Sequence, residues 1–173
     1  MSEPRPSLLI GVDYGGVCSA ASDRYETEPT DLSVENGINV PDCLETLHLL
    51  KSQGHRLVLI SFCGKQRSIS TRKYFYKIDN PFTELYFVRK RDYKTHVCKK
   101  LQVDVMIDDR LDILMTIPPT QTIQFGSHES NSLVKFTPTR VVQTWREIPD
   151  IIASLSKLDL PDGSAIDISK MCY

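Results

Sequence analysis

The sequence lacks a long hydrophobic run, a paired-cysteine motif and an excess of either charge. No apolar stretch approaches the roughly 18 to 20 residues that a membrane-spanning helix needs, so no membrane role is expected. The five cysteines are scattered and contain no Cys-x-x-Cys pair. This pattern favours reduced thiols over a disulfide framework and gives no zinc motif.

Charge is also balanced, with 21 basic and 22 acidic residues and a formal net charge of −1. Proteins that bind the phosphate backbone normally show a basic field or stripe, so the composition gives no nucleic-acid signature. The one basic concentration that we single out is Arg89-Lys90-Arg91 together with Lys94, Lys99 and Lys100. A solvated helix face explains it best.

The N-terminal residues lead straight into an apolar stretch, without the longer apolar segment and small-residue cleavage site of a signal peptide. Together with the cysteine pattern, this predicts a soluble protein of a cytoplasmic compartment.

Three common site types are only partly represented. Cys18 to Arg24 has the Cys-x5-Arg spacing of cysteine phosphatases, but few glycines lie in this stretch and no histidine precedes the cysteine. Gly64-Lys65 lacks the earlier glycine and the following Ser or Thr of a phosphate-binding loop. The four histidines show no ligand spacing. None of these patterns carries a functional assignment.

What the sequence does contain is an alternation of apolar strands and amphipathic helices. Strands are predicted at residues 8–12, 56–61, 84–88, 104–108 and 122–125, and helices at 41–53, 65–78, 93–101 and 149–158. In the first of these helices, Leu44, Leu47, Leu49 and Leu50 supply the apolar face that we expect to be buried. This order favours an α/β three-layer sandwich, with a central parallel sheet and helices on both faces.

The domain organisation follows from the same pattern. Residues 1–160 are predicted to form a single core domain, because 173 residues with 40% hydrophobic content fit one compact unit. The polar stretch 18–40 is interpreted as a short flap or minimal cap. Residues 161–173 are interpreted as a polar C-terminal tail, and Trp145 as part of the core.

Polar groups stand where the predicted strands end. Asp13, Ser61 and the pair Asp108-Asp109 each follow or close an apolar strand, and Lys94 lies in the helix before the fourth strand. Open α/β sheets place their chemistry at this edge. Two adjacent carboxylates repel each other unless a cation is near, and phosphoryl transfer needs a nucleophile, a metal and donors for the phosphate oxygens. These residue types supply those parts.

The stretch Asp13-Tyr14-Gly15-Gly16-Val17 resembles the first motif, Asp-x-Asp-Gly-Val/Thr, of the haloacid dehalogenase (HAD) superfamily. The order of the later residues and the run from Lys94 to Leu101 are similar to the remaining motifs of that family. The resemblance covers about Leu8 to Arg110 and implies the HAD-like, Rossmann-type fold. The fragment from Ser61 to Arg67 is also similar to small members of the family carried by large DNA viruses and phages.

The resemblance also implies roles for individual residues. It implies that Asp13, the Gly15 carbonyl and Asp108 bind Mg²⁺, and that Asp109 completes the metal site by orienting the water shell of the ion. It implies that Asp13 is the nucleophile as well, and that Lys94 stabilises charge during catalysis. Ser61, Phe62 and Lys94 are the implied substrate-binding residues.

One position departs from the family pattern. Gly15 stands where the family has its general acid, and glycine can neither protonate a leaving group nor activate water. Two functions therefore stay open. One is a magnesium-dependent phosphohydrolase that is weak or restricted in its substrates, and the other is a catalytically inactive HAD-fold protein with a binding or regulatory role.

Cap size bears on the phosphorylated substrate, whose identity is unknown. The insertion at 18–40 is short, and nothing of cap size lies between the third strand and Lys94. In the family that the motifs resemble, minimal caps accompany large substrates or a cap from a partner subunit. The resemblance therefore leaves a macromolecular substrate and a homodimer open.

Overall fold

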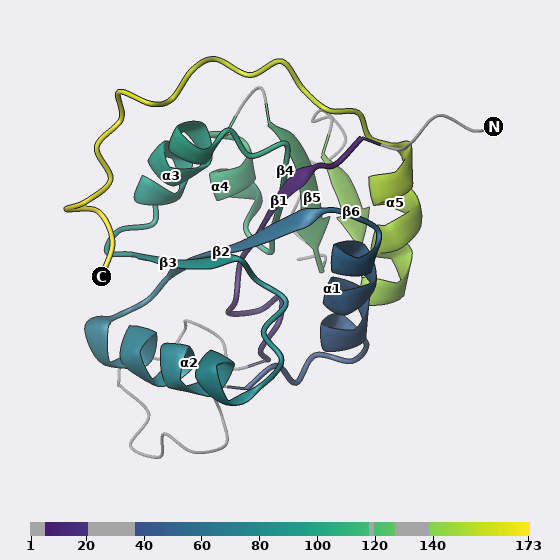
Figure 1. The fold of residues 1–173 in the computed structure, drawn as a ribbon, viewed down its shortest axis with the longest axis horizontal. Helices are drawn as coiled ribbons and strands as arrows, with labels where there is room; N and C mark the ends of the chain where they lie inside the picture. Colours follow the sequence, from purple (N-terminus) through teal and green to yellow (C-terminus); the bar gives the residue numbers. More distant parts are fainter. Residues whose placement is uncertain (1–5, 21–36, 118–119, 127–138) are drawn as a thin grey trace.

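The computed structural model describes residues 6–20, 37–117, 120–126 and 139–173. In these residues six strands form one parallel sheet in the order β3-β2-β1-β4-β5-β6 (Figure 1). The strands are β1 (Leu9–Val12), β2 (Arg56–Phe62), β3 (Glu84–Val88), β4 (Val105–Asp108), β5 (Gln121–Phe125) and β6 (Arg140–Val142). The helices are α1 (Cys43–Ser52), α2 (Lys65–Lys77), α3 (Tyr93–Leu101), α4 (Leu111–Leu114) and α5 (Ile148–Ser154), with the 3-10 turn η2 (Trp145–Glu147) before α5.

The strand order locates the edge where a ligand is expected. The chain starts in the middle of the sheet at β1, builds outward through β2 and β3, and then returns to β4 on the other side of β1. The direction of building therefore reverses between β1 and β4. Ligands of open α/β sheets bind at such a switch point, outside the carboxyl ends of the strands.

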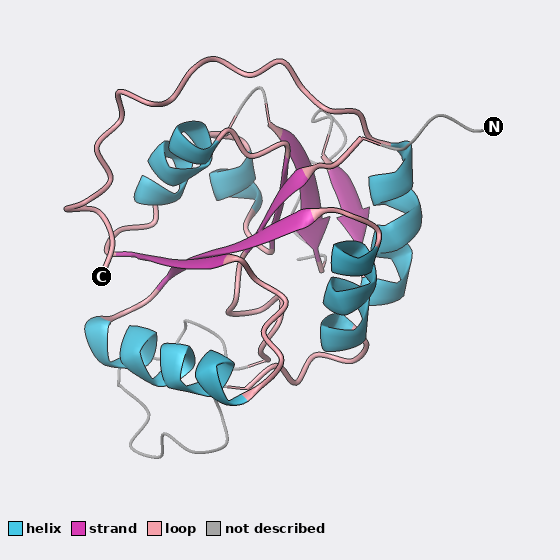
Figure 2. Ribbon diagram, viewed as in Figure 1, coloured by secondary structure: helices cyan, strands magenta, loops and turns pink. Residues whose placement is uncertain are grey.

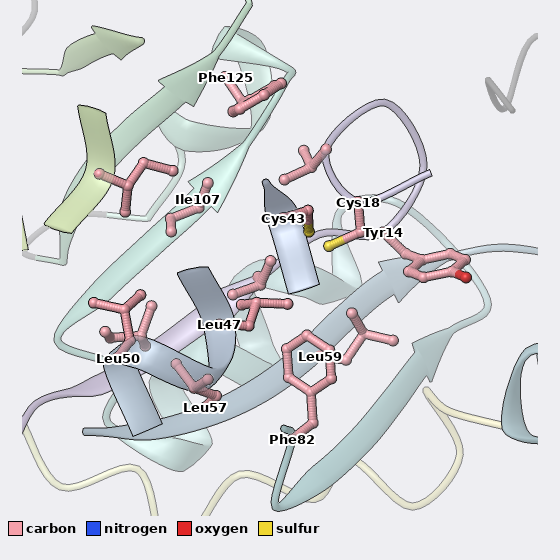
Figure 3. Close-up of a cluster of buried hydrophobic side chains, with 14 of the residues drawn as sticks. Tyr14, Cys18, Cys43, Leu47, Leu50, Leu57, Leu59, Phe82, Ile107 and Phe125 are labelled. Atoms are coloured by element: carbon pink, nitrogen blue, oxygen red, sulfur yellow. The ribbon is translucent and has the colours of Figure 1, made fainter. Parts of the chain in front are cut away.

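Helices cover both faces of the sheet, as the alternation of elements predicts (Figure 2). On one face, Leu47 of α1 and Ile152 of α5 share a buried cluster with strand residues such as Ile107. Figure 3 shows part of this cluster, in which Leu57 and Leu59 of β2 point toward α1. On the other face, α3 and α4 pack against a second cluster around Met106. The predicted α/β sandwich is confirmed.

The five predicted strands are present, and a sixth, β6, was not predicted. It has only three residues, and just one of them, Val142, is fully buried. The α5 helix is also shorter than predicted, because Leu155 has an extended backbone (φ −88°, ψ 155°) and ends it. Periodicity is a weak signal over elements this short.

The first helix begins two residues later than Pro41. Asp42 has φ +61°, in the left-handed region, so helical backbone starts only at Cys43. Within α1, Leu49 is 44% exposed and so lies outside the buried face that was predicted for it, whereas Thr46 is buried. Helix α1 is therefore oriented so that Thr46 is buried and Leu49 is exposed.

The C-terminal segment packs back onto the domain. It passes over α3, where Gly163 lies so close to the backbone that a Cβ would meet the Lys99 carbonyl oxygen at 2.0 Å. It then runs antiparallel to β3, with a bridge between Val88 and Cys172 (Figure 1). The Arg89 amide donates to Met171 at 2.8 Å, and the Tyr173 amide donates to Phe87 at 2.9 Å. This pairing covers the end of β3, which is one of the two edge strands of the sheet.

Most of the insertion that was predicted as a flap, residues 21–36, lies outside the described residues. Its two ends are joined, because the amides of Asn39 and Val40 both donate to the Cys18 carbonyl at 3.1 Å. The Ala20 amide donates to the Asn39 side chain at 2.7 Å. No helix in the described ranges is long and apolar enough to cross a membrane.

Trp145 joins the C-terminal third of the chain to the loop that follows β1. Its indole N–H donates to the Val17 carbonyl at 2.8 Å, and the residue is fully buried. We expect Trp145→Phe to lose about 1–3 kcal/mol of unfolding free energy, because it leaves that carbonyl buried without its donor. Urea denaturation followed by circular dichroism measures the change. Tyr76→Phe, at a 94% exposed position, is the control, and an equal effect of both variants would contradict the role of this bond.

Candidate functional site

The site begins at the end of β1. Gly11 and Val12 pair with Met106 and Ile107 of β4, and the Asp13 amide continues this ladder by donating to the Ile107 carbonyl at 2.9 Å. Asp13 is 1% exposed. The backbone thus fixes its carboxylate at the switch point between the two central strands.

Lys94 connects this carboxylate to β4. Its ammonium lies 2.9 Å from Asp13 Oδ1 and 2.7 Å from Asp108 Oδ2, and all three side chains are almost completely buried. Burial alone would lower the pKa of Lys94, but the Asp108 and Asp13 carboxylates outweigh it and hold the pKa above its ordinary value. Lys94 is therefore charged and does not belong to the solvated basic face that the sequence suggested.

A third carboxylate completes the cluster. Suitable oxygens of Asp13, Asp108 and Asp109 all lie within 4.8 Å of one another. Asp109 is packed against Gly16, where a Cβ would come within 2.4 Å of Asp109 Oδ2. Gly16 also has φ +77°, which side chains rarely adopt. The loop after β1 thus needs glycine at position 16 for two separate reasons.

The donor set fits a hard divalent cation. All candidate ligands are oxygens, the kind that Mg²⁺ prefers. Three carboxylates lie around one ammonium in a mostly buried space, and Arg110 interacts electrostatically with Asp109 and Asp108. Asp108 is held in place for the role of a ligand, because its other oxygen accepts the Arg110 amide at 2.9 Å.

The loop after Asp13 folds into a tight turn. The Tyr14 carbonyl accepts the amides of Cys18 at 2.9 Å and Ser19 at 3.0 Å, and the Gly16 amide donates to the Ser19 carbonyl at 2.8 Å. Gly15 is buried in this turn and is not among the residues with positive φ. The turn holds the backbone of Gly15 two residues after Asp13, which is part of the carboxylate cluster.

Cys18 does not have the character of a nucleophilic cysteine. It is fully buried, and its thiol lies 3.4 Å from the Asp13 carbonyl, to which it donates. Burial, followed by the neighbouring Cys43, raises the pKa of Cys18 well above its ordinary value. Reactive cysteines need a lowered pKa. Arg24, the other end of the Cys-x5-Arg pattern, lies outside the described residues.

Ser61 and Phe62 end β2 and point to opposite faces of the sheet, as neighbours on a strand do. Ser61 is 3% exposed and lines a small hollow together with Gly15, Arg67 and Thr71. The Phe62 ring belongs to the other face, where the Arg91 guanidinium lies 4.6 Å from its centroid.

The structure therefore brings Asp13, Lys94, Asp108 and Asp109 into direct proximity, and places Ser61 in a hollow shared with Gly15. Two further residues of that hollow, Arg67 and Thr71, were not singled out from the sequence. They lie four residues apart on α2, so the helical period is the signal that could have related them. The importance of Gly16 was also missed.

Comparison with solved structures shows which proteins share this fold. D,D-heptose 1,7-bisphosphate phosphatase from B. bronchiseptica, solved with magnesium and phosphate, has a TM-score of 0.63 at 13% identity and covers 84% of this chain and 97% of its own. A HAD-like family hydrolase from Xanthomonas campestris has a TM-score of 0.58 at 10% identity, covering 88% and 97%. A HAD-superfamily hydrolase from Ehrlichia chaffeensis has 0.56 at 12% identity, covering 89% and 99%.

No protein-family model matches the sequence, and no curated protein matches it either. At identities this low, the likeness to solved structures shows the fold alone. The chain has the Rossmann-like α/β fold of these HAD-superfamily hydrolases.

The buried ammonium leads to a prediction about stability. In Lys94→Met, the carboxylates of Asp13 and Asp108 lose the cation between them and repel each other. We expect a loss of about 3–5 kcal/mol at pH 7 in the absence of divalent cations. Like-charge repulsion raises carboxylate pKa values in the folded variant, so protonation stabilises it and the loss should shrink toward about pH 5.

Urea denaturation at the two pH values measures this difference. Lys99→Met is the matched control, because Lys99 is an exposed lysine of the same helix. If the loss in Lys94→Met were the same at both pH values, charge repulsion would not be its cause.

Proposed function

We propose that this protein is a magnesium-dependent phosphohydrolase that uses Asp13 as its nucleophile. One observation carries the proposal: a buried lysine bridges two carboxylates at the switch point of the sheet, and a third carboxylate lies beside them. Three carboxylates close together supply the oxygen ligands that a divalent cation binds. A bound cation and the buried lysine would together offset the negative charge of a phosphoryl group.

The chain's own residues supply the covalent step. A carboxylate oxygen of Asp13 attacks the phosphorus of a phosphate monoester, the bond to the leaving oxygen breaks, and an aspartyl phosphate forms. Water then cleaves the acyl phosphate, which releases inorganic phosphate and restores the carboxylate. Lys94 contacts Asp13 Oδ1, which orients the carboxylate.

Charge on the phosphoryl group must be offset during this step. The Lys94 ammonium of α3 and the Ser61 hydroxyl of β2 would supply this role. Asp13, Asp108, Asp109 and the Gly15 carbonyl would hold Mg²⁺, which supplies Lewis-acid neutralisation of phosphate charge when bound. Phosphatases of the same fold, such as the heptose bisphosphate enzyme solved with magnesium and phosphate, support this choice of metal and substrate class.

Gly15 limits the reaction. The chain has no carboxylic acid two residues after the nucleophile, and general acid–base catalysis typically contributes about 10²–10⁴-fold. Substrates whose leaving groups need little protonation should therefore react best. The same observation favours the second function, in which the protein binds a metal or phosphoryl ligand without turnover and acts as a binding or regulatory protein.

Hydrolysis of para-nitrophenyl phosphate distinguishes the two functions, because this leaving group departs without a general acid. We expect magnesium-dependent release of nitrophenol by the wild type and a loss of about 10³-fold or more in Asp13→Asn, which removes the nucleophile. Nitrophenol absorbance measures both rates. Activity that survives in Asp13→Asn would place the nucleophile elsewhere, and no activity above that blank would favour the binding protein.

A second prediction concerns the missing acid. Because Gly15 does not have positive φ, an aspartate there meets no backbone strain of that kind. We expect Gly15→Asp to raise the rate on an alkyl phosphate by about tenfold or more and to change the rate on an aryl phosphate much less, since only the alkyl leaving group needs a proton. Phosphate release from β-glycerophosphate and para-nitrophenyl phosphate measures the ratio.

Gly15→Asn is the matched control, because it has nearly the same shape but cannot donate a carboxylic proton. Equal gains on both substrates, or an equal gain in Gly15→Asn, would mean that the absent acid does not limit the reaction.

A further inference from the structure

Helix α2 concentrates positive charge that the overall composition conceals. Its thirteen residues, Lys-Gln-Arg-Ser-Ile-Ser-Thr-Arg-Lys-Tyr-Phe-Tyr-Lys, contain five basic side chains and no acidic one. The whole chain has a formal net charge of −1. Charge is therefore unevenly distributed along the chain. The sequence suggested a single basic concentration, in the segment after β3, but α2 is a second one.

The helical period separates α2 into two faces. Thr71 and Phe75 are buried and face the domain. Successive steps of three or four residues from Lys65 define a second face, which is exposed. It consists of Lys65, Ile69, Arg72, Lys73 and Tyr76. Tyr76 is 94% exposed and Ile69 is 39% exposed, so neither is needed by the core.

This face continues onto the end of β3. Arg72 donates to the Tyr173 carbonyl at 3.0 Å, and the Arg89 guanidinium lies 4.9 Å from the centroid of the Tyr173 ring. Cations of α2 and of the residue after β3 thus lie around Tyr173. We call this surface the basic face, comprising Lys65, Ile69, Arg72, Lys73 and Tyr76 of α2, together with Arg89 and Tyr173.

The basic face adjoins the candidate site. Its first residue, Lys65, follows the end of β2, where Ser61 lines the hollow shared with Gly15. In the described part of the chain, no carboxylate forms an ion pair with Lys65 or Lys73. A helix of this length runs for about 20 Å, so the charges extend well beyond a single phosphate group.

The composition of the face selects the kind of ligand. A small anion or a polyphosphate would account for the lysines and arginines but not for an exposed tyrosine among them. Single-stranded nucleic acid presents both a repeating phosphate charge and unstacked bases, which bind basic grooves and aromatic side chains together. We propose that the basic face of α2 and the β3–α3 connection binds single-stranded nucleic acid.

This inference is independent of the proposed phosphohydrolase reaction, because it concerns binding outside the carboxylate cluster. It is tested with the full chain and a fluorescein-labelled oligothymidylate of about twelve nucleotides, by fluorescence anisotropy at about 50 mM salt without magnesium. We expect wild type and Asp13→Asn to bind equally. The double variant Lys65→Glu/Lys73→Glu should bind about tenfold or more weakly, with a shallower dependence on salt.

The matched control is Lys51→Glu/Lys99→Glu, which reverses two exposed lysines in the last turns of α1 and α3. It makes the same change in net charge on two helices outside the basic face, and we expect its effect to be less than about threefold. If both double variants weakened binding equally, net charge would explain the result and the proposal would be overturned. Absence of binding by the wild type would overturn it as well.

Tyr76→Ala separates nucleic acid from other polyanions. We expect about fivefold weaker binding of the oligothymidylate, because base stacking on the ring is lost, and no change in competition by inorganic polyphosphate. An unchanged affinity for the oligonucleotide, or an equal loss for polyphosphate, would show that the face binds charge without recognising bases. Circular dichroism of each variant checks that the fold is retained, which is expected because these side chains are exposed.

Discussion

The contact of Lys94 with Asp13 and Asp108 is the interaction on which the rest of the site depends. It joins the loop after β1, the helix α3 and the end of β4, three segments that are far apart in the sequence. A buried ammonium between two carboxylates offsets much of the cost of removing each charge from water, whereas any one of them left alone would be strongly unfavourable. The arrangement is therefore stable only as a whole, and it fixes the carboxylates before any ligand binds.

Two glycines adapt the loop after β1 to this cluster in different ways. Gly16 is required by the fold of the loop, since its positive φ and its contact with Asp109 leave no room for a side chain. Gly15 has no positive φ, so its backbone conformation does not require glycine. Trp145 holds the same loop from the far end of the sequence through the Val17 carbonyl. The shape of the loop therefore depends on contacts at both of its ends.

The distribution of charge gives the molecule two distinct regions near one edge of the sheet. The carboxylate cluster is buried and has more acid than base, whereas α2 is exposed, basic and interspersed with aromatic rings. Opposite charges in adjoining regions do not cancel when one is buried and the other solvated, because the solvated charges are screened within about 10 Å at moderate salt. A net charge near zero is therefore compatible with a polyanion-binding surface.

The sequence by itself determined the sheet, its five longer strands and the edge at which Asp13, Ser61 and Asp108 lie. Alternating apolar segments and strand-terminal aspartates are local features, so they can be read along the chain. The three-residue strand β6, the outward orientation of Leu49 and the pairing of residues 171–173 with β3 depended on long-range packing, which has no local pattern. Lys94 illustrates the same limit, because the sequence offered two interpretations of it: part of a solvated basic helix face, or a residue of the site. Only the tertiary structure decided between them, by placing two carboxylates beside its ammonium in the interior.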